Sequence, residues 1–183
     1  MPVFKELDGY KRFDDWATMT PNKQLFDLEA EGLRTVLDHF KPYQTLVLGP
    51  DVEVVPAREA TMVRLTHNAE RGLSADVEAS YQLLPFADES FDLVVCPHIQ
   101  ELVSCEARLF SELSRVMMSE GLLVLYGVNP MGVLQWSNWG GLGNKYAWLR
   151  RTYYRKGLST VLGAYGFDYV YRGYGVHQLS LGQ

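Results

Sequence analysis

The chain has 183 residues, a formal net charge of −5, 47% hydrophobic residues and 21% charged residues. These values are typical of one soluble domain with a substantial core, and the acidic balance disfavours binding of nucleic acid or anionic membrane by the whole surface. The apolar runs are too short to span a membrane, and residues 1–10 lack the pattern of a signal peptide. Only two cysteines occur, Cys96 and Cys105, so we expect a cytoplasmic protein with reduced thiols.

The first half of the chain predicts one helix followed by strands. After an N-terminal extension over residues 1–20, Thr20-Pro21 is typical of a helix start. Apolar residues then continue at helical spacing as far as Phe40, and Pro42 ends the helix. Short apolar runs predict three buried strands, which are residues 45–48, 62–66 and 91–96.

The second half alternates helices and strands and then changes pattern. Its predicted elements are a helix over 101–118 that Gly121 stops, a strand over 122–126, a helix over 154–165 followed by Gly166, and strands over 167–171 and 176–181. The last two strands are joined by a short turn and are predicted to form an antiparallel hairpin. Residues 127–150, rich in Gly and Trp, are predicted to be a substrate or partner loop. This order predicts a single α/β domain over residues 1–183, with three layers and a mostly parallel, twisted sheet.

Four short motifs carry a family resemblance. They are Leu84-Pro85-Phe86, Ser90-Phe91-Asp92, Ser114-Arg115-Val116-Met117 and Glu120-Gly121-Leu122-Leu123-Val124. In this order they resemble the class I S-adenosylmethionine (SAM) dependent methyltransferases, in particular the type 11 branch, over roughly residues 16–172. The resemblance implies a three-layer Rossmann-like methyltransferase fold with an antiparallel C-terminal hairpin, SAM as the cofactor, and methyl transfer as the activity.

The resemblance also implies where the cofactor lies. In such a fold the ligand sits at the carboxyl ends of the strands. The residues expected to contact SAM are Gly49, Pro50, Asp51, His67, Asn68, Ser80, Leu83, Leu84, Cys96 and Pro97. Three of these contact regions depart from the family pattern. We therefore keep open a catalytically inactive protein of the same fold that acts as an interaction or binding module.

The departures concern groups that would touch the cofactor directly. After the first strand the family has a glycine-rich loop, whereas this chain keeps one glycine, Gly49, followed by Pro50, Asp51 and bulky Val52. The second strand ends near His67-Asn68, whereas the family has a carboxylate that accepts hydrogen bonds from the ribose hydroxyls. The third departure is Ser80, which stands where an aspartate usually contacts the adenine amino group; Asp76 and Glu78 lie nearby.

The acceptor side of the predicted site keeps polar groups. Cys96, Pro97 and His98 follow the central strand, where the family holds methyl acceptors. Methyl transfer is an in-line displacement that needs alignment and, for some acceptors, a base. By position His98 is the candidate catalytic base, and the alternative is a structural histidine bonded to the backbone. The acceptor itself, whether a small molecule or a macromolecule, is not identified by the sequence.

Other groups of residues bear on binding of a metal, a nucleic acid, a partner or another nucleotide. Cys96, His98, Cys105 and Glu106 fit no structural zinc spacing, so we expect no metal. Basic and aromatic residues gather over 145–156, which suits an anionic strand, but a solvated helix face is the favoured interpretation and nucleic acid is not a favoured partner. The tryptophan-rich loop suits an acceptor lid, a protein partner or a second copy of the chain. A module for another nucleotide is a third hypothesis, while the absence of Gly-x-Gly-x-x-Gly disfavours a nicotinamide dehydrogenase.

Overall fold

A parallel sheet forms the centre of the protein. The computed structural model describes residues 20–49, 61–66, 75–103, 105–127 and 155–168. The strands in these ranges are β1 (Gln44–Leu48), β2 (Thr61–Thr66), β3 (Val77–Glu78), β4 (Phe91–Pro97) and β5 (Met117–Tyr126). Their order in the sheet is β3-β2-β1-β4-β5, and each described pairing is parallel. The chain therefore builds outward from β1 in one direction and then in the other, so the strand order reverses between β1 and β4.

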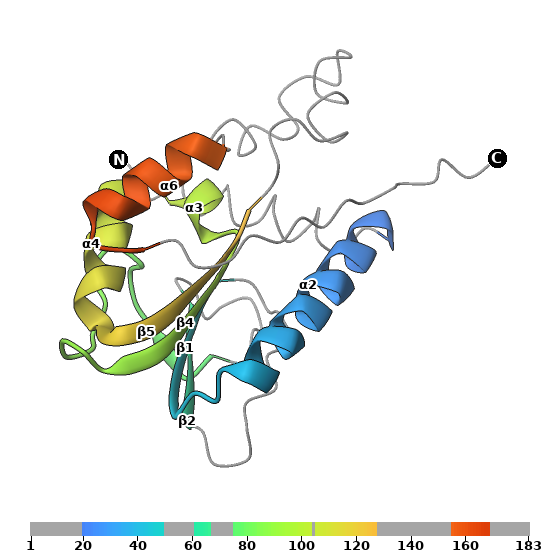
Figure 1. The fold of residues 1–183 in the computed structure, drawn as a ribbon, viewed down its shortest axis with the longest axis horizontal. Helices are drawn as coiled ribbons and strands as arrows, with labels where there is room; N and C mark the ends of the chain where they lie inside the picture. The colour runs from blue at the N-terminus through green and yellow to red at the C-terminus, as the bar shows by residue number, and fades with distance from the viewer. Residues whose placement is uncertain (1–19, 50–60, 67–74, 104, 128–154, 169–183) are drawn as a thin grey trace.

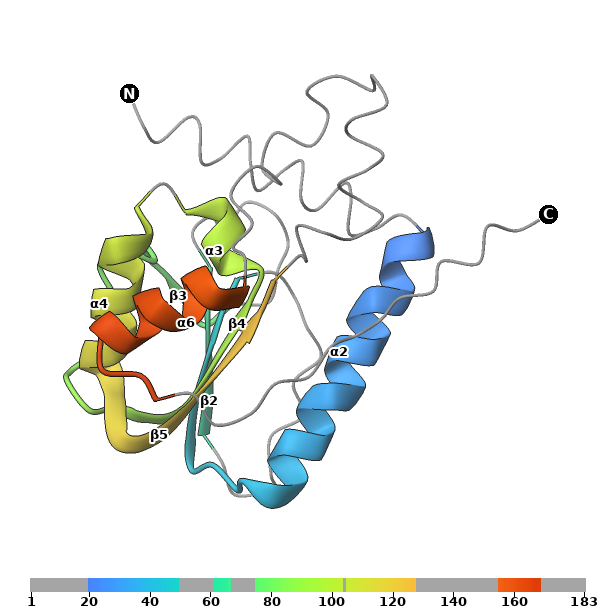
Figure 2. The same cartoon turned by 45° about the horizontal axis from the view of Figure 1, so that its top comes forward.

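Helices cover both faces of this sheet. Helix α2 (Thr20–His39) lies along one face (Figure 1). The opposite face carries α3 (Ile99–Leu102), α4 (Glu106–Val116) and α6 (Arg155–Ala164), as the turned view also shows (Figure 2). The predicted three-layer α/β architecture with a mostly parallel sheet is therefore confirmed. Among the described residues, no helix is long and apolar enough to cross a membrane.

The sheet separates two apolar cores. Successive side chains of a strand point to opposite faces, so each central strand contributes to both. On the side of α4 and α6, the buried strand residues are Leu46, Leu48, Leu65, Phe91, Val94, Cys96 and Met117. On the side of α2, Leu33 packs with Val47, Leu93 and Val95. Burial on both faces explains why β1 and β4 are nearly continuous apolar runs in the sequence.

Most of the expected elements are present with small shifts in their ends. The predicted strands over 45–48, 62–66 and 91–96 correspond to β1, β2 and β4, and the predicted helix over 154–165 corresponds to α6. Gly166 has φ 85° just past α6, where Phe167 N–H donates to the Leu162 carbonyl and Gly166 N–H to the Gly163 carbonyl, both at 3.2 Å. This pair of bonds is the Schellman arrangement, so the prediction that Gly166 ends the helix is confirmed. On α2 the expected apolar face is less regular, because Leu28 is 50% exposed.

The helix predicted over 101–118 is wrong. It is two helices, α3 and α4, because Val103 and Cys105 have extended backbone angles. The second helix ends at Val116, since Met117 already pairs with Phe91 of β4. Strand pairing between distant segments has overridden the local helical periodicity.

Gly121 has a role other than the predicted helix stop. It lies inside β5, where the pairing with β4 changes register between Phe91 and Leu93. A Cβ at this position would stand 2.9 Å from the Met118 carbonyl oxygen and 3.3 Å from the Asp92 carbonyl oxygen. Glycine therefore allows the strand to bend closely past its neighbour.

The remaining differences concern one very short strand and segments that lie outside the described residues. The two-residue strand β3 was not predicted, because it is too short to leave a periodic pattern. The hairpin strands over 167–171 and 176–181 lie outside the described residues except for 167–168, which are not in a strand. The loop over 127–150 and the extension over 1–20 also lie outside them, apart from residues 127 and 20.

Asp92 ties the start of β1 to β4. Its carboxylate accepts hydrogen bonds from the backbone N–H of Tyr43 at 2.7 Å and of Gln44 at 2.9 Å. These amides begin the central strand, and a carboxylate bonds such donors more strongly than a neutral acceptor does. This contact gives a structural reason for the aspartate in Ser90-Phe91-Asp92.

We predict that Asp92→Ala lowers the free energy of unfolding by about 1–2 kcal/mol, because two backbone donors lose a charged acceptor. Urea unfolding followed by circular dichroism measures the change. Asp27→Ala, at an exposed position of α2, is the matched control and should change stability by less than about 0.5 kcal/mol. Equal effects of the two substitutions would contradict the role given to Asp92.

Candidate functional site

The reversal of strand order brings the carboxyl ends of β1 and β4 together. In open α/β sheets, ligands bind in the crevice at this point. Gly49 follows β1 with φ 110°, a conformation that side chains disfavour. A Cβ on Gly49 would lie 2.9 Å from Ile99 Cδ1 and 3.1 Å from the Pro97 carbonyl oxygen. Only glycine therefore allows the two strand ends to approach this closely.

His98 stands at the end of β4 and is held through both backbone and side chain. Its N–H donates to the Tyr126 carbonyl of β5 at 2.9 Å, and its φ is 54°. Its Nε2 lies 3.1 Å and 3.2 Å from the two carboxylate oxygens of Glu29 on α2. The imidazole is fully buried, and the Phe26 ring packs against it in a T-shaped arrangement with centroids 5.7 Å apart. The side chain of His98 therefore pairs with a carboxylate.

Sequence reasoning missed Glu29 as the partner of this histidine. Glu29 lies 69 residues before His98, so no local spacing connects the two. The available signal was its place on α2, among Phe26, Ala30 and Leu33, the last two of which are buried. A carboxylate on the core-facing side of a helix needs a polar partner. The sequence therefore indicates that Glu29 needs a polar partner, but it does not identify that partner as His98.

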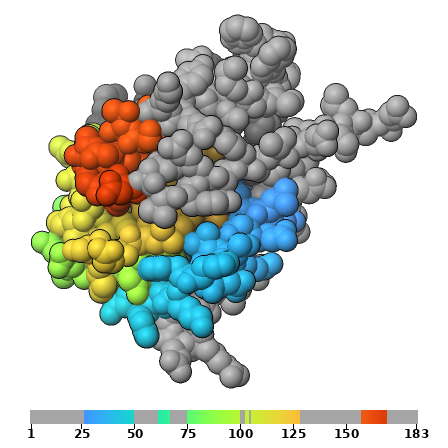
Figure 3. All heavy atoms as spheres, in the orientation of Figure 1, coloured from blue at the N-terminus to red at the C-terminus, as the bar shows by residue number. Residues whose placement is uncertain are grey.

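Tyr126 of β5 connects α2 with the end of β4. Its hydroxyl donates to the backbone carbonyl of Glu29 at 2.9 Å. Burial, and secondly the negative charge of Glu29, raise the pKa of Tyr126 well above its usual value. The hydroxyl therefore stays protonated and keeps its donor role. In the space-filling view, atoms of α2 lie directly against those of the β5 region (Figure 3).

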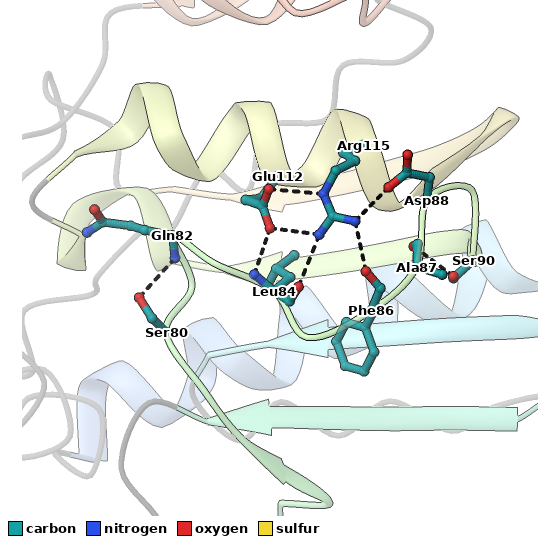
Figure 4. A network of polar contacts seen from close by, with 9 residues as sticks. All are labelled: Ser80, Gln82, Leu84, Phe86, Ala87, Asp88, Ser90, Glu112 and Arg115. Carbon is teal, nitrogen blue, oxygen red and sulfur yellow. Dashed lines mark hydrogen bonds and ion pairs between the residues drawn. The ribbon is translucent and has the colours of Figure 1, made fainter.

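The loop before β4 is fixed by two side chains of α4 (Figure 4). Arg115 Nη1 donates to the Phe86 carbonyl and to Asp88 Oδ1, both at 2.8 Å, and Nη2 donates to the Leu84 carbonyl at 3.0 Å. Glu112 accepts from Arg115 at 3.0 and 2.8 Å and from the Leu84 N–H at 2.7 Å. We call these contacts the Glu112–Arg115 clamp. It gives a structural reason for the motif around Leu84-Pro85-Phe86 and for the arginine in Ser114-Arg115-Val116-Met117.

The clamp determines which groups of this loop remain available to a ligand. Leu84 is 3% exposed, and both its N–H and its carbonyl are bonded to α4, so it serves the core more than the crevice. Leu83, by contrast, is 74% exposed. The Ser80 hydroxyl accepts from the Gln82 N–H at 3.2 Å and retains a second lone pair.

Asp76 is the nearby carboxylate with a clear structural role. It accepts the Arg64 N–H at 2.8 Å, while its own N–H donates to the Arg64 carbonyl. These bonds lie just before β3, at the amino end of the strand. Asp76 therefore extends the pairing of β2 and β3 and lies away from the edge where Gly49 and Pro97 meet.

The remaining expected residues divide into a core residue and four undescribed positions. Cys96 is fully buried in the core on the side of α4, and burial raises the pKa of its thiol. The residues Pro50, Asp51, His67 and Asn68 lie outside the described ranges. Among the residues that are described, no cluster of three or more His, Cys, Asp or Glu side chains could hold a metal ion.

We predict acid sensitivity from Glu112. The hydrogen bond from Arg115 lowers its pKa below the usual 4.5, against an opposing effect of burial and with help from the Leu84 N–H. A carboxyl whose pKa is lower in the folded state stabilises the fold above its unfolded pKa, and this stabilisation is lost as pH falls through the folded value. Stability should therefore fall below about pH 4.5.

Glu112→Gln tests this origin. The variant should lose about 1–2 kcal/mol at neutral pH and show a flatter fall in stability below pH 4.5. Urea unfolding at a series of pH values measures both effects. Glu120→Gln, at an exposed position, should keep the wild-type profile. An unchanged profile for Glu112→Gln would refute the assignment.

The two cysteines should react differently. An alkylating reagent should label Cys105, which is partly exposed, and leave Cys96 unmodified in the native protein. Unfolding should make both thiols reactive. Mass spectrometry of the labelled peptides measures this, and equal native labelling would show that Cys96 does not face the core.

Comparisons with known proteins agree with the fold. Residues 38–125 match a family model described as a methyltransferase domain. Among curated proteins, the uncharacterized protein YafS of Escherichia coli K12 is 34% identical over 64 residues, which are 35% of this chain. The match spans 27% of that relative's length.

Solved structures share the fold more widely. A SAM-dependent methyltransferase from Thermotoga maritima aligns with a TM-score of 0.64 at 15% identity, over 87% of this chain and 77% of that one. A SAM-dependent methyltransferase from Aquifex aeolicus gives 0.53 at 14% identity, over 73% and 78%. The [4+2]-cyclase SpnF gives 0.55 at 25% identity, over 79% and 56%. Residues 38–125 therefore match the methyltransferase-domain model, and the chain shares the α/β Rossmann-like fold of solved SAM-dependent methyltransferases.

Proposed function

We propose that this protein is a SAM-dependent methyltransferase. The cofactor would lie at the carboxyl ends of β1 and β4, and the methyl acceptor beside His98 at the ends of β4 and β5. The observation that carries the proposal is the position of Gly49, a glycine with φ 110° at the reversal of strand order. The match of residues 38–125 to the methyltransferase domain supports the same reaction.

Three described positions support the proposal that SAM binds at these strand ends. Gly49 lets the end of β1 lie against Pro97 and Ile99, which brings together the two strand ends that would flank the cofactor. Ser80 offers a hydroxyl with a remaining lone pair, and Leu83 offers an exposed apolar side chain from the same loop. Pro97 and the positions Pro50, Asp51, His67 and Asn68 would complete the contacts. When bound, SAM supplies a methyl group on a positively charged sulfur, which is open to attack by a nucleophile.

The binding test is calorimetry with SAM and with S-adenosylhomocysteine. The wild-type protein should bind both, and Gly49→Ala should bind at least about tenfold more weakly, because the new Cβ would displace Ile99 and strain a positive φ. Gly166→Ala is the matched control: it carries the same kind of strain at φ 85°, with nothing within 4 Å of the new Cβ. This control should lose stability and keep its affinity. Thermal unfolding of each variant separates loss of binding from loss of fold.

A second candidate function is an inactive protein of the same fold that binds a protein partner or a second copy. The single glycine after β1, followed by Pro50, Asp51 and Val52, favours it. The similarity to SpnF adds a solved structure of this fold that is described as a cyclase. Failure of the wild-type protein to bind either compound at millimolar concentration would overturn the methyltransferase proposal and leave this one. A different nucleotide found in the purified protein by mass spectrometry would favour a third function, binding of that nucleotide.

A further inference from the structure

The Glu29–His98 pair carries an inference that rests on the proposed function and goes beyond it. We infer that Glu29 is a positioning residue, which holds His98 as the base for an acceptor that loses a proton from oxygen or nitrogen. The acceptor class would then be hydroxyl, phenol or ring N–H compounds. An acceptor that is already an anion, such as a thiolate, would not need the pair.

The first support is the geometry of the pair. Nε2 of His98 contacts both carboxylate oxygens of Glu29, at 3.1 and 3.2 Å, with the imidazole fully buried and the carboxylate side chain 10% exposed. In a neutral imidazole one nitrogen donates a proton and the other holds a lone pair. A carboxylate at Nε2 selects the tautomer whose Nε2 carries the proton, so the basic lone pair lies on Nδ1. The same carboxylate stabilises the imidazolium that forms when that nitrogen takes a proton.

The second support is that both members of the pair are fixed. The Tyr126 hydroxyl bonds the Glu29 carbonyl at 2.9 Å, and the His98 N–H bonds the Tyr126 carbonyl at 2.9 Å. His98 also keeps φ 54°, a left-handed conformation that is strained for a residue other than glycine and persists where its surroundings enforce it. This strain sits at the end of β4, where the acceptor is expected.

The third support is the origin of Glu29. It lies on α2, before the segment 38–125 that matches the methyltransferase domain. His98 follows β4 within that segment, so the pair joins two elements that lie far apart in the sequence and forms only when α2 packs against the sheet.

The reaction balances with this pair. The acceptor atom loses its proton to the imidazole and forms a bond to the methyl carbon. The electron pair of the broken carbon–sulfur bond stays on sulfur, which becomes neutral. One positive charge is lost at sulfur and one appears on His98, beside the carboxylate of Glu29. The imidazolium then returns its proton to water when the product leaves.

The burial of His98 sets a condition on acceptor entry. An acceptor must shift part of the cover to reach the ring, and the described part of that cover includes Phe26, which is itself partly buried. Closing such a site again excludes water and strengthens the electrostatic contact between the ring and Glu29.

The experiment compares acceptors that need a base with one that does not. Wild type, Glu29→Gln, His98→Gln and Tyr126→Phe are incubated with methyl-labelled SAM and catechol, benzimidazole, thiophenol or a cell extract. At mildly alkaline pH, thiophenol is already a thiolate. We expect Glu29→Gln to lower kcat for catechol and benzimidazole by about tenfold or more and His98→Gln by about 100-fold, with thiophenol changed by less than about twofold. Affinity for SAM should not change.

Tyr126→Phe removes the hydroxyl that fixes Glu29 without touching the carboxylate, so it should lower kcat for catechol and benzimidazole by a smaller factor than Glu29→Gln does. Asp27→Asn, at an exposed position of α2, is the matched control and should leave all acceptors unchanged. An equal loss for all acceptors in Glu29→Gln would show that the pair only docks α2, which overturns the inference and leaves the proposed function standing. The inference would also be overturned if the wild-type protein bound SAM but gave labelled product from the thiol alone, or gave no labelled product. A wild-type protein that binds no SAM overturns both.

Discussion

The Glu112–Arg115 clamp is the interaction on which the central part of the structure depends. The segment between β3 and β4 has little regular structure, so its backbone groups need partners from elsewhere. Arg115 and Glu112 provide them for Leu84 and Phe86, and the α4 backbone continues the pattern where Ser90 N–H donates to the Val116 carbonyl. A planar guanidinium can make several such bonds at once, which explains the choice of arginine. The start of β4 is thereby fixed.

Strand β4 connects the clamped loop with the edge of the sheet where the strands have their carboxyl ends. One end is held by the clamp and by Asp92, while the other presents Pro97 and His98 to their neighbours. Because its side chains are buried on both faces, the strand has little freedom to move in register. The position of His98 beside Glu29 therefore follows from packing across the whole sheet.

The fold and the reaction are separate questions. Solved structures described as methyltransferases share this fold, and so does one described as a [4+2]-cyclase. Chemistry is decided by the side chains placed at the strand ends. Here they include a glycine where the ends of β1 and β4 meet and a histidine that pairs with a carboxylate from α2. Glu29 comes from α2 and His98 follows β4, so the pair forms only when the helix and the sheet pack together.

The sequence by itself determined the α/β class, the strands β1, β2 and β4, the helix end at Gly166, and the place of Gly49 and His98 at strand ends. These features depend on local periodicity and on the backbone preferences of single residues, which short segments record. Only the tertiary structure decided the break between α3 and α4, the early start of β5, the burial of Leu84 and Cys96 and the pairing of His98 with Glu29. Each of these depends on contacts between segments far apart in the chain. Such contacts override local preference and leave no fixed spacing in the sequence.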